Sequence, residues 1–241
     1  MKNSIKAIEI EAFGGPENMQ LVDKPVPVPG PGEVRVRLAA IGVNLIDTYH
    51  RTGLYPVPLP SGLGVEGAGE VEAVGEGVDL PVGTRVALTM ALGAYAEAIV
   101  LPAAALITLP NSVDFEQAAA VLLKGMTVDY LFTDTFPLDG GETVLFHAAA
   151  GGVGLIACQW ARHIGVNLIG TASTDEKCAL AESHGAKKCV LSGAQNLAET
   201  LKALAPGRKA VVVGHSYGGA VALRLALDYP ELVTGLVLLA P

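Results

Sequence analysis

Short alternating runs of hydrophobic and polar residues fill the first half of the chain. The clearest runs are residues 34–40 (VRVRLAA), 69–74 (GEVEAV), 84–90 (TRVALTM) and 96–101 (AEAIVL). A two-residue period is typical of strands that bury one face, and the glycine and proline clusters between the runs indicate turns. The pattern therefore predicts a β-rich first part, folded as a partly open barrel or a sandwich.

The pattern changes near Asp114, where residues 114–132 predict a helix capped by Asn111 or Ser112. Beyond this helix, strand and helix patterns alternate to the end of the chain. The predicted strands are 143–149, 166–173, 187–192, 209–214 and 234–241, and the predicted helices between them are 151–165, 174–185, 197–207 and 217–230. Such alternation predicts right-handed βαβ units and a parallel sheet, which we expect in the order 3-2-1-4-5.

Composition supports an α/β fold and narrows the class of protein. Hydrophobic residues make up 51% and charged residues 17% of the 241 residues, as expected when parallel strands are buried on both faces. No apolar run reaches the roughly 18 residues of a membrane-spanning helix. Glu9 and Glu11 interrupt the segment where a signal peptide would be apolar. The net charge of −8, without a basic block, argues against nucleic acid and membrane partners. We expect a cytoplasmic protein.

The cysteines are Cys158, Cys178 and Cys189, an odd number without a CxxC pair. This spacing argues against a disulfide framework and against a structural metal site, and it favours a reducing compartment. We interpret them as three buried or half-buried thiols and expect no metal.

Residues 147–154 (HAAAGGVG) stand between a predicted strand and a predicted helix. With Gly151 and Gly154 they fit a dinucleotide-binding turn, in which Ala149 takes the place of the first glycine. Such a turn brings the backbone close to a pyrophosphate and directs the N–H groups of a helix N-terminus toward it. We predict a dinucleotide site here; the alternative is a tight strand-to-helix turn without a ligand.

The end of the next predicted strand favours one cofactor. An NAD site usually has an acidic residue there for the ribose 2′-hydroxyl. This chain has Ser173 and Thr174, with Lys177 one turn into the following helix. Hydroxyl groups beside a lysine suit a 2′-phosphate, so NADPH is favoured, although Asp175 is also near. The alternative for Lys177 is a solvated helix charge.

Residues 1–192 resemble the NADPH-dependent quinone oxidoreductases, the zeta-crystallin-like branch of the medium-chain dehydrogenase/reductase family. The matching stretches are AIGVNLIDTYHRTGLYP, LPSGLGVEGAGEVEAVGEGV, AAVLLKGMTVDYLF and LFHAAAGGVGLIACQWA. The resemblance implies a GroES-like catalytic domain (1–123) and a Rossmann-like NADP-binding domain (124–241), with a cleft between them. It also implies zinc-free hydride transfer from NADPH to a quinone or an enone.

The same resemblance implies roles for individual residues. The substrate cleft would be lined by Asn44, Asp47, Tyr49 and Tyr55. The cofactor would be bound by Thr127 at its nicotinamide end, by Gly151, Gly152, Val153 and Gly154 at its pyrophosphate, and by Ser173 and Lys177 at its 2′-phosphate. Each has a structural alternative: turn formation for Asn44 and Asp47, packing for the tyrosines, and a plain helix position for Thr127.

Residues 193–241 instead resemble α/β-hydrolases around their nucleophile. The stretch Gly214 to Gly218 (GHSYG) fits G-x-S-x-G, which exposes a serine, here Ser216, at a sharp strand-to-helix turn. No histidine follows Ser216, and the only acids after it are Asp228 and Glu231, so the triad lacks its base. Serine hydrolase activity is therefore disfavoured. A chance pair of Ser216 with His147 is a separate hypothesis.

The two resemblances together suggest an engineered chimera joined between about Leu191 and Pro206. On this interpretation the last two sheet strands are hydrolase-derived, and the C-terminal part of the catalytic domain is missing. We expect quinone reductase activity to be weakened or lost. The alternative is a catalytically inactive fold chimera, so enzyme status and oligomeric state stay open.

Overall fold

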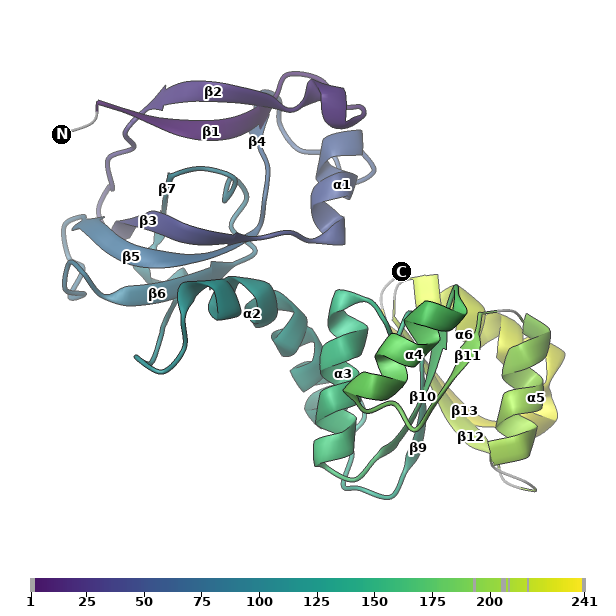
Figure 1. Ribbon diagram of the computed structural model, residues 1–241. Helices are drawn as coiled ribbons and strands as arrows, with labels where there is room; N and C mark the ends of the chain where they lie inside the picture. The colour runs from purple at the N-terminus through teal and green to yellow at the C-terminus, as the bar shows by residue number, and fades with distance from the viewer. Residues whose placement is uncertain (1–2, 193, 205–206, 208, 216, 240–241) are drawn as a thin grey trace. The chain divides into compact units, whose positions relative to one another are not determined.

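A computed structural model describes residues 3–192, 194–204, 207, 209–215 and 217–239. The chain divides into two compact units, residues 1–123 and residues 124–241. Each unit has its own secondary structure and hydrophobic core, and Figure 1 traces both in chain order. The units are therefore described one at a time.

The first unit is built on two antiparallel sheets. The larger sheet has the order β7-β3-β5-β6-β8 and the smaller one β2-β1-β4. Their strands are β1 (Ser4–Ile10), β2 (Gln20–Pro25), β3 (Glu33–Gly42), β4 (Ser61–Gly62), β5 (Glu66–Val74), β6 (Arg85–Thr89), β7 (Ala98–Pro102) and β8 (Leu106–Thr108). The alternating runs in the sequence thus form strands, but the first two strands carry no comparable signal.

Strand β3 shows how the sequence pattern becomes a two-faced sheet. Val34 and Val36 are fully buried in the core of the larger sheet. The arginines between them face outward, where Arg35 pairs with Glu72 at 2.8 Å and Arg37 pairs with Glu70 at 2.5 Å. Because side chains alternate along a strand, one face carries the core and the other carries cross-strand ion pairs.

Helices of the first unit are few. Helix α1 (Leu45–Thr52) follows β3, and helix α2 (Phe115–Tyr130) runs to the start of the second unit. Asp114 precedes α2 and caps it, since its carboxylate accepts from the Gln117 N–H at 2.6 Å. The predicted cap at Asn111 or Ser112 was wrong by two to three positions, because Asp114 with Gln117 forms the reciprocal pair that satisfies the first N–H groups. Short 3₁₀ turns cover Pro16–Asn18 and Ala103–Ala105, and a π turn covers Leu131–Thr135.

The second unit alternates strands and helices. Its strands are β9 (Thr143–Phe146), β10 (Asn167–Ala172), β11 (Lys188–Leu191), β12 (Ala210–His215) and β13 (Val233–Leu239). Its helices are α3 (Gly152–His163), α4 (Asp175–His184), α5 (Ala194–Leu204) and α6 (Tyr217–Asp228), with a 3₁₀ turn at Pro230–Leu232. Every strand and helix predicted after residue 140 is present, within a few residues at each end.

The parallel sheet is hydrogen-bonded in two pieces. One ladder has the order β11-β10-β9 and the other joins β12 to β13. Strand β12 lies next to β9, yet no ladder hydrogen bond between them is found among the described residues. The expected continuous order 3-2-1-4-5 is therefore not established. The predicted strand 143–149 ends at Phe146, because Ala148 leaves the extended region with φ 51°.

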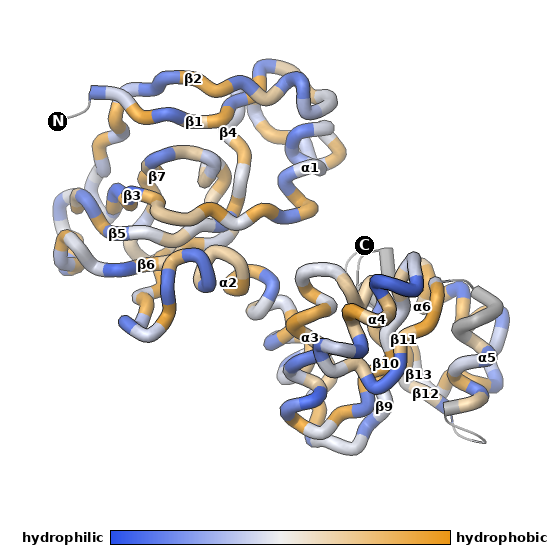
Figure 2. The backbone as a smooth tube through the Cα atoms, in the orientation of Figure 1, coloured by the Kyte–Doolittle hydropathy of each residue, from blue (hydrophilic) through white to orange (hydrophobic). Residues whose placement is uncertain are grey.

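Packing follows the same division. Helices α3 and α4 lie side by side against β10 and β11, over a core that includes Cys158, Leu168 and Cys189. Helix α6 packs on β12 and β13 over a second core, to which Leu145 of β9 also contributes. Figure 2 shows hydrophobic colour along much of α6 and hydrophilic colour at the start of α4. Among the described helices, none combines the length and the apolar composition needed to cross a bilayer.

Candidate cofactor site

A sharp turn joins β9 to α3. Ala148 has the left-handed φ of 51°, and its carbonyl accepts from the Gly151 N–H at 2.8 Å. The Ala149 N–H donates to the carbonyl of Thr171 on β10 at 2.9 Å, which fixes the turn to the sheet. Gly151 caps α3 in an extended conformation. The helix therefore begins at the carboxyl edge of the sheet with its first N–H groups free of helical partners.

Gly154 allows this turn to close. A Cβ atom at position 154 would lie 2.5 Å from the carbonyl oxygen of Ala148 and 2.6 Å from backbone atoms of Ala149. Gly152 is under a milder constraint, since a Cβ there would meet only the Lys124 side chain, at 2.9 Å. Glycine at 154 is thus required by backbone contact, as in a dinucleotide turn.

The residue at the first glycine position, Ala149, is accommodated by the next strand. Ala149 is fully buried, and a Cβ atom at position 170 would lie 2.6 Å from its methyl group. Gly170 of β10 therefore provides the room that Ala149 needs.

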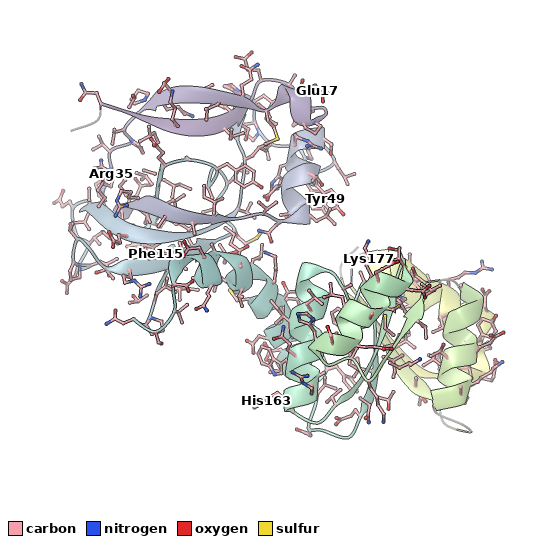
Figure 3. All side chains as sticks on the ribbon, viewed as in Figure 1. Glu17, Arg35, Tyr49, Phe115, His163 and Lys177 are labelled. Atoms are coloured by element: carbon pink, nitrogen blue, oxygen red, sulfur yellow. The ribbon has the colours of Figure 1, made fainter. Side chains whose placement is uncertain are left out.

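Lys177 lies at the start of α4 (Figure 3), next to the hydroxyl groups of Ser173 and Thr174. Thr174 caps the helix and accepts from the Lys177 N–H at 3.3 Å. The Lys177 ammonium donates to Ser173 Oγ at 3.1 Å. The Lys177 ammonium therefore places one positive charge at the end of β10, next to the acidic Asp175 and Glu176 of the same helical turn.

His147 is held under the turn. Its Nδ1 lies 2.9 Å from Thr171 Oγ1, and its Nε2 is buried without a hydrogen bond to a described residue. Burial lowers the pKa of the imidazole below its ordinary range. The ring is therefore neutral near pH 7 and supports the turn as an uncharged group.

A cavity of about 730 Å³ connects these groups. Its wall is formed by the turn, the ends of β10 and β11, the start of α4 and one face of α6. Its lining residues are His147, Ala148, Ala150, Gly151, Thr171, Ala172, Ser173, Lys177, Ser192, Ala220, Val221, Arg224, Leu225, Asp228 and Tyr229. This volume is within the range of small-molecule and cofactor sites.

The wall contributed by α6 was not anticipated from the sequence. Arg224 donates through Nε to Asp228 at 2.6 Å, and both residues line the cavity. Their i, i+4 spacing is a signal for a helix ion pair, but spacing alone does not show which cavity the pair faces. The placement depends on how α6 packs on β12.

Predicted cofactor residues divide into two groups. Gly151, Ser173 and Lys177 line the cavity. The other four predicted residues do not line the cavity: Thr127, Gly152, Val153 and Gly154. Val153, in the first turn of α3, packs on the core, and Thr127 is half-buried on α2. Ser216 lies outside the described residues, as does its hypothetical pairing with His147.

The predicted substrate residues of the first unit cluster on α1. Asn44 caps the helix, and its N–H donates to Asp47 Oδ2 at 2.8 Å. The same carboxylate oxygen accepts from the Tyr95 hydroxyl at 2.8 Å. Burial, followed by the hydrogen bond to Asp47, raises the pKa of Tyr95. Asn44 and Asp47 thus have a structural role in capping α1, and Tyr95 is the partner that sequence analysis missed.

The amide of Asn44 and two tyrosine rings complete this cluster. Asn44 Nδ2 donates to Glu66 Oε2 at 2.8 Å, and Glu66 is fully buried. The rings of Tyr49 and Tyr55 meet edge to face with centroids 5.3 Å apart, and Tyr55 is 43% exposed. The cluster therefore contains a side-chain amide held by Glu66 and a tyrosine pair with one exposed ring. Within the described residues there is no group of three or more histidine, cysteine or acidic side chains arranged to hold a metal ion.

Two family descriptions match the chain. "Alcohol dehydrogenase GroES-like domain" matches residues 30–111, and "Zinc-binding dehydrogenase" matches residues 152–231. The structure of a quinone oxidoreductase from Pseudomonas syringae superposes with a TM-score of 0.87 at 48% identity, covering 97% of this chain and 72% of that one.

The chain belongs to the quinone oxidoreductases of the medium-chain dehydrogenase/reductase family.

Two further quinone oxidoreductases support this placement. The protein from Pseudomonas aeruginosa is 56% identical over 216 residues, covering 88% of this chain and 66% of that protein. The Escherichia coli structure, complexed with NADPH, has a TM-score of 0.86 at 38% identity, covering 98% of this chain and 80% of that one. The chain spans about two thirds of the length of the curated relatives it matches.

The comparisons give no support to the second resemblance. The zinc-binding dehydrogenase match continues to residue 231, through most of the segment that resembled α/β-hydrolases. None of the quinone oxidoreductase matches indicates a hydrolase fragment or a chimera. A G-x-S-x-G pattern between a strand and a helix is thus insufficient evidence of a separate origin in a fold that repeats strand–turn–helix units.

Proposed function

We propose that the chain binds NADPH in the cavity of its second unit and acts as an NADPH-dependent quinone oxidoreductase. The observation that carries the proposal is the joint position of Gly151, Ser173 and Lys177 on one cavity wall. A helix N-terminus for the pyrophosphate and an ammonium for the 2′-phosphate are the two features that an NADP site needs.

The residues present fit the cofactor. Gly154 lets the turn close on the start of α3, because a Cβ atom there would meet the backbone of Ala148 and Ala149. Lys177 and Ser173, already hydrogen-bonded at 3.1 Å, would hold the 2′-phosphate through charge-assisted hydrogen bonds. Family relatives from Escherichia coli and a mycobacterium have been solved with NADPH, which supports the same cofactor here. When bound, NADPH supplies the hydride for reduction of a quinone or an enone.

We assign the substrate-contacting role to the α1 cluster of the first unit. Asn44 is held from two sides, by Asp47 at its N–H and by Glu66 at its side-chain nitrogen. This leaves the amide oxygen in a fixed orientation. Tyr49 and Tyr55 offer the aromatic surface on which a flat quinone ring can stack. Thr127 is assigned to the nicotinamide end by resemblance to the family.

The first experiment is a titration with NADPH followed by nicotinamide fluorescence, with NADH as the comparison. We expect saturable binding with NADPH preferred. A Lys177→Gln variant should lose about tenfold to a hundredfold in NADPH affinity, the equivalent of ~1.5–3 kcal/mol for a hydrogen bond to a charged group. Its NADH affinity should not change, since NADH lacks the 2′-phosphate.

Lys188→Gln is the matched control, because Lys188 is an exposed lysine of β11 that does not line the cavity. Equal losses in the two variants would show a general charge effect and contradict the assignment. Quinone reduction is then measured as quinone-dependent loss of NADPH absorbance. Binding without turnover would support the cofactor site while contradicting the proposed activity.

The chimera and serine hydrolase hypotheses receive no support from these observations. The α/β-hydrolase likeness of residues 193–241 stays a prediction from the sequence alone. We therefore propose neither as the function of this chain.

A further inference from the structure

The second unit contains a pair of thiols that the proposed reaction does not use. Cys178 of α4 and Cys189 of β11 have their sulfur atoms 2.8 Å apart, in an S–H···S contact from Cys189 to Cys178. Both cysteines are free and nearly buried, with exposures of 8% and 6%. A disulfide requires a separation near 2.05 Å, so closing the bond takes a sulfur displacement of less than about 1 Å.

The backbone around the pair is fixed from both sides. The Cys189 N–H donates to Glu182 Oε1 on α4 at 2.8 Å, which holds the strand against the helix. The first turn of α4 is fixed by the Thr174 cap. The backbone positions of the two cysteines are therefore held across the contact between α4 and β11 in which the sulfurs meet.

The third thiol differs in this respect. Cys158 is fully buried on α3, and its nearest described hydrogen-bond acceptor is the Ala149 carbonyl at 3.8 Å. Burial raises the pKa of Cys158 to about 11. Cys158 thus provides an internal control, a buried cysteine whose described hydrogen bond goes to a carbonyl and not to another sulfur.

We propose that Cys178 and Cys189 form a redox-active dithiol that a hydroperoxide converts to a disulfide. This site does not depend on the proposed quinone reductase function. It ties the first turn of α4, which carries Lys177, to the start of β11.

The chemistry assigns a different role to each sulfur. Cys178 loses its proton, its thiolate attacks one oxygen of hydrogen peroxide, and the O–O bond breaks. The departing hydroxide takes up that proton, so Cys178 sulfenic acid and one water form. Cys189 then attacks the Cys178 sulfur, the S–O bond breaks, and the departing hydroxide takes the Cys189 proton to form water. In sum, two thiols and one peroxide give one disulfide and two waters.

The S–H···S contact supports this order. Cys189 donates its S–H toward Cys178, so the Cys178 sulfur is the acceptor of the pair. Burial, followed by that hydrogen bond, raises the pKa of Cys189 to about 12. Cys189 therefore stays protonated until a sulfenic acid forms beside it, and it acts as the resolving thiol.

Peptide mapping tests the proposal directly. Trypsin cleavage separates the cysteines into three peptides, 125–162, 178–187 and 189–202. The reduced full-length chain is treated with hydrogen peroxide, unfolded in acid, alkylated and digested. We expect peptides 178–187 and 189–202 to be joined, with Cys158 alkylated. Full alkylation of all three cysteines, or a cross-link that includes Cys158, would overturn the proposal.

Variants separate the two roles. In Cys189→Ser, dimedone should trap a sulfenic acid on Cys178; in Cys178→Ser, Cys189 should stay alkylatable. Cys158→Ala should form the same cross-link as the unmodified chain. Dimedone labelling of Cys189 in place of Cys178 would contradict the assigned order, and the map of the unmodified chain decides the question even if a variant does not fold.

Discussion

The methyl group of Ala149 fills the space that Gly170 leaves on the neighbouring strand. A Cβ atom at position 170 would lie 2.6 Å from the Ala149 methyl, while the Ala149 N–H donates to Thr171, the next residue of β10. A dinucleotide turn usually has glycine where this chain has Ala149. The turn and β10 still approach closely here, because the glycine of this contact is Gly170 on the strand and not a residue of the turn.

This relationship predicts a rescue. Gly170→Ala should lower the free energy of unfolding of the second unit by ~1–3 kcal/mol, because two methyl groups would compete for one space. Adding Ala149→Gly should restore most of the loss. Trp160 of α3 is the only tryptophan, so its fluorescence during urea unfolding follows this unit. If the double variant is as unstable as Gly170→Ala alone, the methyl group of Ala149 is not what Gly170 makes room for.

Gly154 and Gly152 should respond differently to the same change. Gly154→Ala places a Cβ 2.5 Å from a backbone carbonyl, so the turn must move, and we expect NADPH binding to be lost. Gly152→Ala meets only the flexible Lys124 side chain and should bind NADPH within a few-fold of the unmodified chain. The fluorescence titration measures both. Equal losses would show that the backbone contact at Gly154 is not the determining one.

His147 predicts a pH dependence of stability. Burial lowers the pKa of this imidazole in the folded chain, so the unfolded chain binds the proton first, near pH 6.5. The free energy of unfolding should therefore fall as the pH decreases through 6.5 toward the lowered folded pKa.

Urea unfolding between pH 7.5 and 5, followed by Trp160 fluorescence, measures this slope. His147→Gln should reduce it, while His163→Gln, at an exposed position of α3, should leave it unchanged. A His147→Gln slope equal to that of the unmodified chain would exclude His147 as the source.

Tyr95 should stabilise the start of α1 through one hydroxyl group. Tyr95→Phe keeps the ring that packs against Gly64 but removes the donor to Asp47 Oδ2. Asp47 is 4% exposed and its Oδ1 already has no described partner, so the loss should cost ~1–3 kcal/mol. Hydrogen exchange of the α1 amides should be faster in Tyr95→Phe than in Tyr49→Phe, whose hydroxyl has no described hydrogen bond. Equal exchange would contradict the role of Tyr95.

Local patterns in the sequence predicted the elements, and distant contacts explain what they missed. The alternation after Asp114 located the strands and helices of the second unit, and the turn at 147–154 was placed correctly between β9 and α3. The pairing of Cys178 with Cys189, like that of Ala149 with Gly170, depends on how β10 and β11 lie beside the α3 and α4 helices. No residue spacing encodes such contacts, so their chemistry could not be read from the chain.

The substrate cluster shows the same limit. Asn44 and Asp47 fit both a helix cap and a functional site, and the structure shows the cap without excluding the site. Tyr95 is 48 residues from Asp47 along the chain. Only the pairing of the sheets brings its hydroxyl to that carboxylate.

The seam between β9 and β12 has a consequence for how this fold tolerates change. Within the described residues, the two strands touch without ladder hydrogen bonds, and the core under α6 extends across to Leu145 of β9. Helix α6 also supplies Arg224 and Asp228 to the cavity wall. Side-chain packing therefore joins the two halves of the sheet where main-chain pairing does not, so a substitution in α6 can alter the cofactor cavity without breaking a ladder.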